Sequence, residues 1–287
     1  MRTTLLYSLL LMLLPVAPTA AELISDIEYG KAGNVSLKLD AWIPEGRGPF
    51  PAAILVHGGA WRGGDKQTFI KPVFEPLTQA GFAWFTINYR LAPDHVYPAA
   101  VDDLVQAVNF VKAHARGYRV DTKRLALIGE SAGGHLVALV GARDGRKLGI
   151  AAVVPFYAPA DMTELTGART PRANEAVFGF LGLKGPGPEA DRLLREASPI
   201  TYVKRAMPPF LLIHGDADPT VPYTQSTKLC ERIKQAGASC ELFAVKGGAH
   251  GMGGWEKDPA LQAYKAKMID WLKTTMRIRP RAPTQRH

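Results

Sequence analysis

Continuous apolar runs alternate with amphipathic segments along most of this chain. An apolar run of roughly four to eight residues is typical of a strand that is buried on both faces of a sheet. Residues 35–43 instead alternate apolar and polar side chains, which predicts an antiparallel strand with one face in solvent. The continuous runs predict further strands at residues 51–56, 82–89, 125–128, 151–157, 210–214 and 240–245.

The segments between these strands carry apolar residues at helical spacing. In the clearest case, Val101, Leu104 and Val108 recur on one face of a helix that is predicted to begin at Pro98. Strands that alternate with helices predict an α/β fold, with a mostly parallel twisted sheet covered by helices on both faces. Functional side chains of such a fold gather where loops leave the carboxyl ends of the strands. Other helices are predicted at residues 69–79, 225–236 and 259–276, and directly after residue 131.

Residues 161–207 interrupt this alternation. The segment is rich in Gly and Pro and contains two short amphipathic pieces, at 176–181 and 190–195. A stretch of this length is uncommon as plain loop inside a compact domain. We therefore predict a small helical cap over the site, with a surface excursion that has no role as the alternative.

The first 21 residues have the pattern of a secretory signal peptide. Arg2 precedes a leucine-rich run at 5–14, and small residues at 19–21 provide a cleavage site ahead of Glu22. The run is shorter than the roughly 20 residues that a spanning helix needs, so we expect cleavage and export, not retention as an uncleaved anchor. The mature part, with no membrane span, is expected to form one catalytic domain at 22–276, because 47% of the 287 residues are hydrophobic.

The net charge of +9 is concentrated at the two ends of the chain. Arg2 leaves with the leader, and four arginines lie in a basic C-terminal tail, residues 277–287, that we predict to be poorly ordered. Without these five charges the body carries +4. No nucleic-acid recognition motif accompanies the charge, so no nucleic-acid partner is expected.

The two cysteines, Cys230 and Cys240, flank a predicted helix end and the next strand. In an exported protein an even pair of cysteines can close a disulfide. Two buried free thiols are the alternative, because the spacing does not say whether the Cα atoms lie within bridging range.

A Gly-x-Ser-x-Gly sequence stands between an apolar strand and a helical pattern. Ser131 is flanked by Gly129 and Gly133, which is the strand, turn and helix context of a nucleophile elbow. The turn is so tight that side chains at the two flanking positions would collide. This geometry would expose the Ser131 hydroxyl and aim the Ala132 N–H, at the start of a helix, toward a developing negative charge.

A serine hydroxyl is a poor nucleophile near neutral pH and needs an adjacent base. His250 follows the last predicted strand, where the base of a Ser-Asp-His chain order belongs. Asp218 is predicted to accept a hydrogen bond from this imidazole and to fix its tautomer. Asp216 on the same loop is the competitor, but it lies nearer to the strand and is expected to bind loop N–H groups.

The oxyanion formed on attack needs two or three hydrogen-bond donors. Ala132 would supply one N–H, and the loop after strand 51–56 would supply the others from Gly59 and Ala60, with Gly58 as the alternative. Trp61, next on this loop, either lines the acyl pocket as a substrate-binding residue or simply packs.

Other polar residues near these motifs are expected to have structural roles. Glu130 beside the nucleophile is interpreted as structural, and His57 as a residue that shapes its loop. The remaining histidines are scattered without metal-ligand spacing such as H-E-x-x-H, so neither a metal nor a cofactor is expected.

Six motifs stand along the chain: HGGAW at 57–61, NYRLAP at 88–93, YPAAVDD at 97–103, GESAGG at 129–134, SPITYV at 198–203 and HGDADPTVP at 214–222. Taken together, they resemble those of α/β-hydrolase carboxylesterases of the hormone-sensitive-lipase-like type, and more closely their bifunctional feruloyl and acetyl-xylan esterase relatives. The resemblance covers essentially all of the mature chain.

The resemblance implies a metal-independent esterase for small acyl groups, with Ser131, Asp218 and His250 as its triad and a small-molecule or polysaccharide-borne ester as substrate. Two departures stand out: Ala60 replaces a glycine of many relatives, which implies a narrower pocket on the alcohol side, and a long N-terminal cap helix is missing. A serine exopeptidase of the prolyl-oligopeptidase type is an alternative, although no propeller-sized region precedes the catalytic part. An inactive hydrolase fold that serves as a binding module is another. Nothing in the sequence indicates an oligomeric state.

Overall fold

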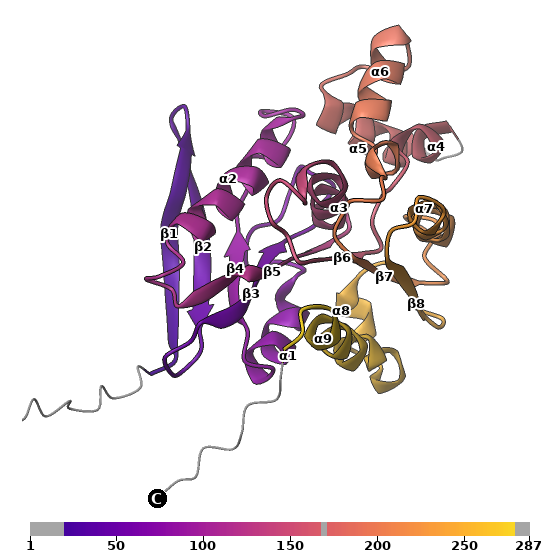
Figure 1. Ribbon diagram of the computed structural model, residues 1–287. Helices are drawn as coiled ribbons and strands as arrows, with labels where there is room; N and C mark the ends of the chain where they lie inside the picture. Colours follow the sequence, from indigo (N-terminus) through magenta and orange to yellow (C-terminus); the bar gives the residue numbers. More distant parts are fainter. Residues whose placement is uncertain (1–19, 168–170, 279–287) are drawn as a thin grey trace, which may run out of the picture.

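One twisted sheet runs through the molecule, with its strands in the order β1-β2-β4-β3-β5-β6-β7-β8 (Figure 1). This computed structural model describes residues 20–167 and 171–278, so the predicted leader lies outside the described part except for its last two residues, and the predicted tail lies outside except for its first two. The strands are β1 (Glu22–Ala32), β2 (Val35–Ile43), β3 (Phe50–Val56), β4 (Ala83–Ile87), β5 (Val120–Glu130), β6 (Ala152–Phe156), β7 (Phe210–Gly215) and β8 (Cys240–Val245).

The pairing of the strands confirms the prediction of a mostly parallel sheet. Strand β2 is antiparallel to both of its neighbours, β1 and β4. All pairs from β4 to β8 are parallel. Strand β1 was not predicted, because Tyr29 is the one buried side chain among its residues and the strand carries no apolar pattern.

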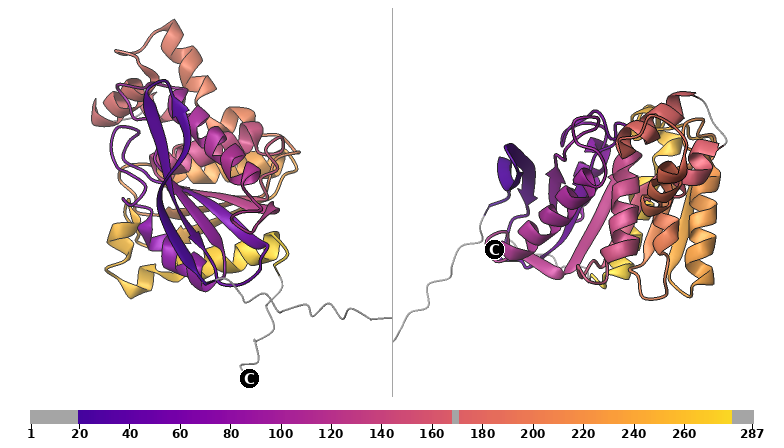
Figure 2. Two further views of the ribbon diagram at one scale, coloured as in Figure 1. Left: turned by 90° about the vertical axis from the view of Figure 1, so that its left-hand side faces the viewer. Right: turned by 90° about the horizontal axis from the view of Figure 1, so that it is seen from above.

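Helices cover both faces of the sheet, with α2, α3 and α7 on one face and α1 and α9 on the other (Figures 1 and 2). The α-helices are α1 (Phe74–Gln79), α2 (Ala99–Ala113), α3 (Ala132–Asp144), α4 (Met162–Gly167), α5 (Pro171–Leu181), α6 (Pro188–Glu196), α7 (Tyr223–Gln235), α8 (Met252–Trp255) and α9 (Ala263–Thr275). Short 3-10 helices are η1 (Lys71–Val73), η2 (Pro199–Tyr202) and η3 (Pro259–Leu261).

The two faces of the sheet bury separate apolar cores. Along β3, Ala52, Ile54 and Val56 pack in the core that contains α2, α3 and α7. Ala53 and Leu55 pack in the core that contains α1 and α9. Successive side chains of a strand point to opposite faces, so a strand between two cores is apolar at every position, as the sequence predicted.

Two predicted helices begin later or are shorter than expected. The helix predicted at 69–79 is divided into η1 and α1, with Pro72 in η1 and Pro76 in the first turn of α1. A proline is tolerated in a first turn because its missing N–H would have no partner there. The closing helix begins at Ala263, after η3, and the short helix α8 was not predicted.

The segment between β6 and β7 is helical in its described part. It contains α4, α5, α6 and η2, and the three α-helices stand beyond one end of the sheet (Figure 1). The segment packs on the body through Phe180, which stacks on Trp61 with 4.7 Å between ring centroids, and through Tyr97, whose hydroxyl donates to the Glu196 carbonyl. Its role as a cap over the substrate stays a prediction.

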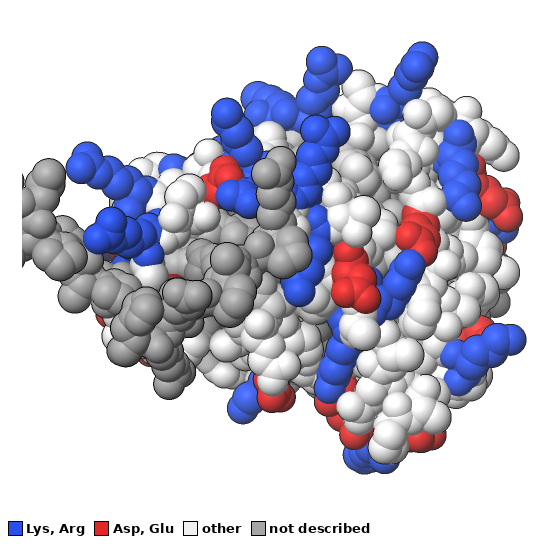
Figure 3. Space-filling model, turned by 60° about the horizontal axis from the view of Figure 1, so that its bottom comes forward, with Lys and Arg blue, Asp and Glu red and all other residues white. Residues whose placement is uncertain are grey.

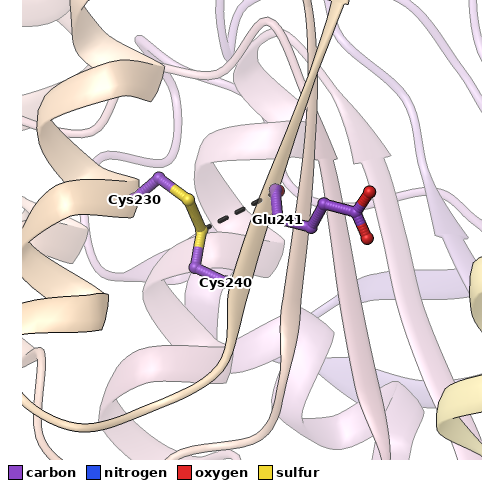
Figure 4. The surroundings of a disulfide bond; sticks show 3 residues. All are labelled: Cys230, Cys240 and Glu241. Atoms are coloured by element: carbon purple, nitrogen blue, oxygen red, sulfur yellow. Dashed lines mark hydrogen bonds between the residues drawn. A yellow bond between two sulfur atoms is a disulfide. The ribbon is translucent and has the colours of Figure 1, made fainter.

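The cysteines form a disulfide, which decides between the two readings that the sequence left open. Cys230 on α7 is bonded to Cys240 at the start of β8, with 5.5 Å between their Cα atoms (Figure 4). The bond ties the C-terminal half of α7 to the edge strand of the sheet, ten residues later in the chain.

Lys and Arg side chains gather on part of the molecular surface, with acidic side chains scattered among them (Figure 3). Within the described residues several Lys and Arg side chains form ion pairs, as Lys265 does with Glu256. In residues 20–167 and 171–278, no helix is long and apolar enough to cross a membrane.

Candidate active site

Ser131 occupies the sharp turn between β5 and α3. Its backbone has φ 51° and ψ −116°, in the left-handed half of conformational space that non-glycine residues rarely adopt. A Cβ added at Gly129 would lie 2.4 Å from the Gly133 carbonyl oxygen, and one added at Gly133 would lie 2.2 Å from the Val56 carbonyl oxygen. The turn therefore needs both glycines: one lets the turn close, and the other lets α3 approach strand β3.

Three side chains from distant loops meet in a hydrogen-bonded series. The Ser131 hydroxyl lies 3.0 Å from Nε2 of His250, and Nδ1 of His250 lies 2.6 Å from Oδ2 of Asp218. Asp218 comes from the loop after β7 and His250 from the loop after β8. With its Nδ1–H donated to the carboxylate, the imidazole presents an unprotonated Nε2 to the serine hydroxyl. This arrangement can remove the hydroxyl proton during attack on a carbonyl carbon.

The Asp218 carboxylate is oriented from several sides. Its Oδ1 accepts hydrogen bonds from the N–H groups of Thr220 and Val221, at 2.7 and 2.9 Å, and its Oδ2 lies 3.3 Å from Nε2 of His214. Burial by itself would raise the pKa of Asp218, but the hydrogen bonds with His214 and His250 outweigh it and hold the pKa well below its usual range. The carboxylate is thus ionised whenever His250 has to become an imidazolium.

Asp216, the competitor on the same loop, lies elsewhere. Its Oδ1 accepts from the Gly247 N–H at 2.7 Å. The adjacent Ala217 N–H donates to the Gly248 carbonyl at 3.1 Å. Both bonds tie the loop after β7 to the loop that carries His250, so Asp216 has the backbone-binding role expected from its position.

The loop after β3 lies against the elbow, because β3 and β5 are adjacent and Val56 pairs with Gly129. The Gly58 N–H donates to the Glu130 carboxylate, so Gly58 is not free to serve as an oxyanion donor. The N–H groups of Gly59 and Ala60 have no acceptor among the described residues, and that of Ala132 is the first of its helix. The sequence predicted these three N–H groups as the oxyanion donors, and this role stays a prediction.

Glu130 joins the loop after β3 to the loop that carries His250. It is 3% exposed, and besides the Gly58 N–H it accepts from the Tyr157 hydroxyl. That hydroxyl in turn accepts from the Met252 N–H at 3.0 Å. Burial raises the pKa of Glu130 to about 7. The sequence interpretation of Glu130 as structural agrees with these contacts, but nothing in the sequence pointed to Tyr157.

Trp61 is buried, with 4% of its surface exposed. Its ring stacks on Phe180 of α5, and its Nε1–H donates to Nδ1 of His135 at 3.1 Å. These contacts favour the packing role that the sequence left as an alternative. Contact of Trp61 with substrate stays a prediction.

Three buried histidines have structural contacts around the site. His57 stacks on Tyr89 with ring centroids 4.4 Å apart, in line with a loop-shaping role. His214 bonds Ser226 and the Val221 carbonyl while it approaches Asp218, and His135 lies one helical turn after Ser131. The sequence analysis left His135 and His214 among the scattered histidines. Yet His135 directly follows GESAGG and His214 is the first residue of HGDADPTVP, which was a usable indication that both lie near the site.

Comparison with known proteins assigns the chain to a family. Residues 39–233 match the BD-FAE family. The chain belongs to the BD-FAE family. This match spans Ser131, Asp218 and the loop after β3 at residues 57–61, named the oxyanion loop for its predicted donors, whereas His250 lies beyond it. One relative is Esterase LipQ of Mycobacterium tuberculosis. It is 31% identical to this chain over 242 residues, which cover 79% of this chain and 56% of that protein. The chain spans about half the length of the curated relatives it matches.

Solved structures similar to this BD-FAE family member include esterases, and they confirm the α/β-hydrolase fold. A truncated form of a carbohydrate esterase from gut microbiota superposes with a TM-score of 0.78 at 28% identity, covering 92% of this chain and 99% of that one. A bifunctional GH43-CE protein of Bacteroides eggerthii gives 0.76 at 29% identity, over 88% of this chain and 38% of that one. Thermogutta terrifontis esterase 2 phosphonylated by sarin gives 0.76 at 26% identity, over 91% and 97%.

No group of three or more His, Cys, Asp or Glu side chains that could hold a metal ion occurs within residues 20–167 and 171–278. The acidic and imidazole groups of the site are instead engaged with one another and with backbone groups.

Proposed function

We propose that this protein is a serine carboxylesterase that cleaves short acyl esters through an acyl-enzyme. The observation that carries the proposal is the continuous series Ser131–His250–Asp218, with two hydrogen bonds of 3.0 and 2.6 Å. Family membership and esterase relatives support it. An inactive binding module would have no reason to keep all three groups in register.

The steps follow from this geometry. His250 Nε2 takes the proton of Ser131 as its oxygen attacks the ester carbonyl, and Asp218 stabilises the imidazolium that forms. The N–H groups of Gly59, Ala60 and Ala132 face the developing oxyanion. His250 then gives the proton to the departing alcohol, and a water molecule repeats the sequence on the acyl-enzyme to release the acid.

The reaction is tested with p-nitrophenyl esters of increasing chain length, dipeptide anilides and a fluorophosphonate probe. We expect acetate or propionate esters to be cleaved and Ser131→Ala to lower kcat by about 10⁵–10⁶ and to abolish labelling. Ser36→Ala, at an exposed position at the start of β2, is the matched control. Labelling that persists in Ser131→Ala, or anilides cleaved faster than esters, would reject the proposal.

For the natural substrate we propose acetyl or feruloyl esters carried on polysaccharide. The support is the carbohydrate-esterase descriptions of two structural neighbours, one of them joined to a GH43 part. Acetate release from acetylated xylan and ferulate release from feruloylated arabinoxylan, compared with p-nitrophenyl acetate, test this step. If both polymers are inert while the small ester is cleaved, the polysaccharide proposal fails and the esterase proposal stands.

Export of the protein is also proposed, with cleavage after residue 21. The leader pattern supports it, and so does the Cys230–Cys240 disulfide, because disulfides persist in oxidising compartments. Intact-mass analysis of the protein recovered outside the cytoplasm should give a chain that begins at Glu22. A chain that begins at Met1 would contradict this.

A further inference from the structure

His135 is a fully buried titratable side chain that the proposed chemistry does not use. It lies on α3 one turn after the nucleophile, and its backbone N–H donates to the Ser131 carbonyl at 2.8 Å. Its ring contacts both the loop after β3 and the helical segment between β6 and β7. A polar ring in such a place needs partners for both nitrogens.

Both ring nitrogens of His135 have one partner each, and these partners determine the tautomer. The Trp61 indole can only donate, so Nδ1 of His135 accepts and is unprotonated, at 3.1 Å. The proton is therefore on Nε2, which donates to the Ala197 carbonyl at 2.6 Å. Ala197 ends helix α6 and is itself fully buried. One neutral imidazole thus joins the helix of the nucleophile, the oxyanion loop and the end of α6.

The oxyanion loop needs such a support, because consecutive non-glycine residues adopt a left-handed backbone. Ala60 has φ 54° and Trp61 has φ 59°, a region that is unfavourable for residues with a Cβ. Such a conformation persists only when surrounding contacts hold it. For Trp61 these contacts are the hydrogen bond to His135, the stack on Phe180 and the bond from the Ala92 N–H to its carbonyl.

We propose that His135 is a positioning residue for the oxyanion hole. Through Trp61 it holds the loop so that the N–H groups of Gly59 and Ala60 point at the same place as that of Ala132. Through Ala197 it fixes the segment between β6 and β7 against this loop. The inference rests on the proposed esterase function and adds to it the residue that orients the donors.

The test uses variants of the full-length protein that remove the two hydrogen bonds separately. His135→Phe removes both. His135→Asn can place an amide oxygen near the Nδ1 position and keep the bond from Trp61, whereas His135→Gln can place an amide N–H near the Nε2 position and keep only the bond to Ala197. Trp61→Phe removes the indole donor and keeps the aromatic stack on Phe180. His114→Phe, at an exposed position after α2, is the matched control.

The readouts are kcat and KM for p-nitrophenyl acetate and the inhibition constant of a trifluoromethyl ketone, whose bound oxyanion needs the same donors. Loss of one whole oxyanion donor lowers kcat by about 10²–10³, so misaligned donors should lower kcat and ketone affinity by roughly 10–100-fold in His135→Phe and Trp61→Phe, with KM nearly unchanged. His135→Asn should keep most of the ketone affinity, and His135→Gln should lose it. The Trp61→Phe/His135→Phe double variant should have a kcat and a ketone affinity no lower than those of the more impaired single variant, because both changes remove the same hydrogen bond.

The proposal is overturned if Trp61→Phe keeps both its ketone affinity and its kcat within about threefold of the unmodified enzyme. It is also overturned if His135→Gln binds the ketone as tightly as His135→Asn, or more tightly. If His135→Phe does not fold, the Asn and Gln variants and Trp61→Phe decide the outcome. Failure of the proposed function would look different: the unmodified enzyme itself would not cleave the ester or react with the fluorophosphonate probe.

Discussion

The buried carboxyl of Glu130 allows the dependence of stability on pH to be worked out. Its pKa is raised from 4.5 to about 7, chiefly by burial. At a pH between these two values, the folded protein keeps a proton on Glu130 that the unfolded chain has released. Raising the pH therefore favours unfolding, and the resulting loss of unfolding free energy is complete once the pH exceeds the pKa of Glu130 in the folded protein. The difference between the two pKa values corresponds to about 3 kcal/mol of unfolding free energy.

Glu130→Gln should remove this loss, because an amide of nearly the same shape stays neutral and its oxygen can still accept from Gly58. Relative to the unmodified protein, the variant should gain about 3 kcal/mol in unfolding free energy between about pH 5 and about pH 8. Urea unfolding followed by tryptophan fluorescence, with the disulfide kept oxidised, measures the two free energies at each pH. Any offset that does not vary with pH reflects the amide's own contacts and does not enter the comparison.

Glu231→Gln, at an exposed position on α7, is the control and should show no such trend. A difference between Glu130→Gln and the unmodified protein that stays constant within about 1 kcal/mol over this pH range would refute the reasoning, and so would a difference that falls as the pH rises. Either result would mean that the carboxyl is solvated or fully compensated when it is ionised.

Three further changes test other parts of the structure. Asp218→Asn should lower kcat for p-nitrophenyl acetate about 10⁴-fold, because the imidazole loses its orienting carboxylate. Asp216→Asn should change this kcat less than about tenfold, and equal losses in the two variants would contradict the assignment of the acid. Gly133→Ala should lower the Tm sharply or prevent folding, because its Cβ would lie 2.2 Å from the Val56 carbonyl oxygen. Gly179→Ala, with open space around the added Cβ, should leave the Tm nearly unchanged, and similar Tm values for the two variants would count against the steric argument. Replacing Cys230 and Cys240 together by serine should lower the unfolding free energy by about 2–3 kcal/mol and leave kcat/KM within about twofold, and an unchanged stability would show that the bond constrains little.

Strands with two buried faces were predictable from the sequence because burial on both sides requires apolar side chains at every position. Strand β3 shows this, and its prediction at 51–56 differs from the structure by one residue. Strand β1 could not be predicted in this way, because it adds to the sheet through backbone pairing with β2 while Tyr29 is its one buried side chain. Backbone hydrogen bonds leave no pattern in the side chains that make them.

The sequence by itself determined the local chemistry of the site: the elbow around Ser131, whose turn closes on the Gly133 carbonyl only with a glycine at position 129, and the order of the serine, acid and base along the chain. Only the tertiary structure decided which groups meet across the sheet edge: Glu130 with Gly58, His135 with Trp61, and Cys230 with Cys240. The physical reason is the range of the forces involved. A strained turn restricts its own few residues and can be read from their identities, whereas partners of buried polar groups are chosen by the packing of segments that are distant in the chain.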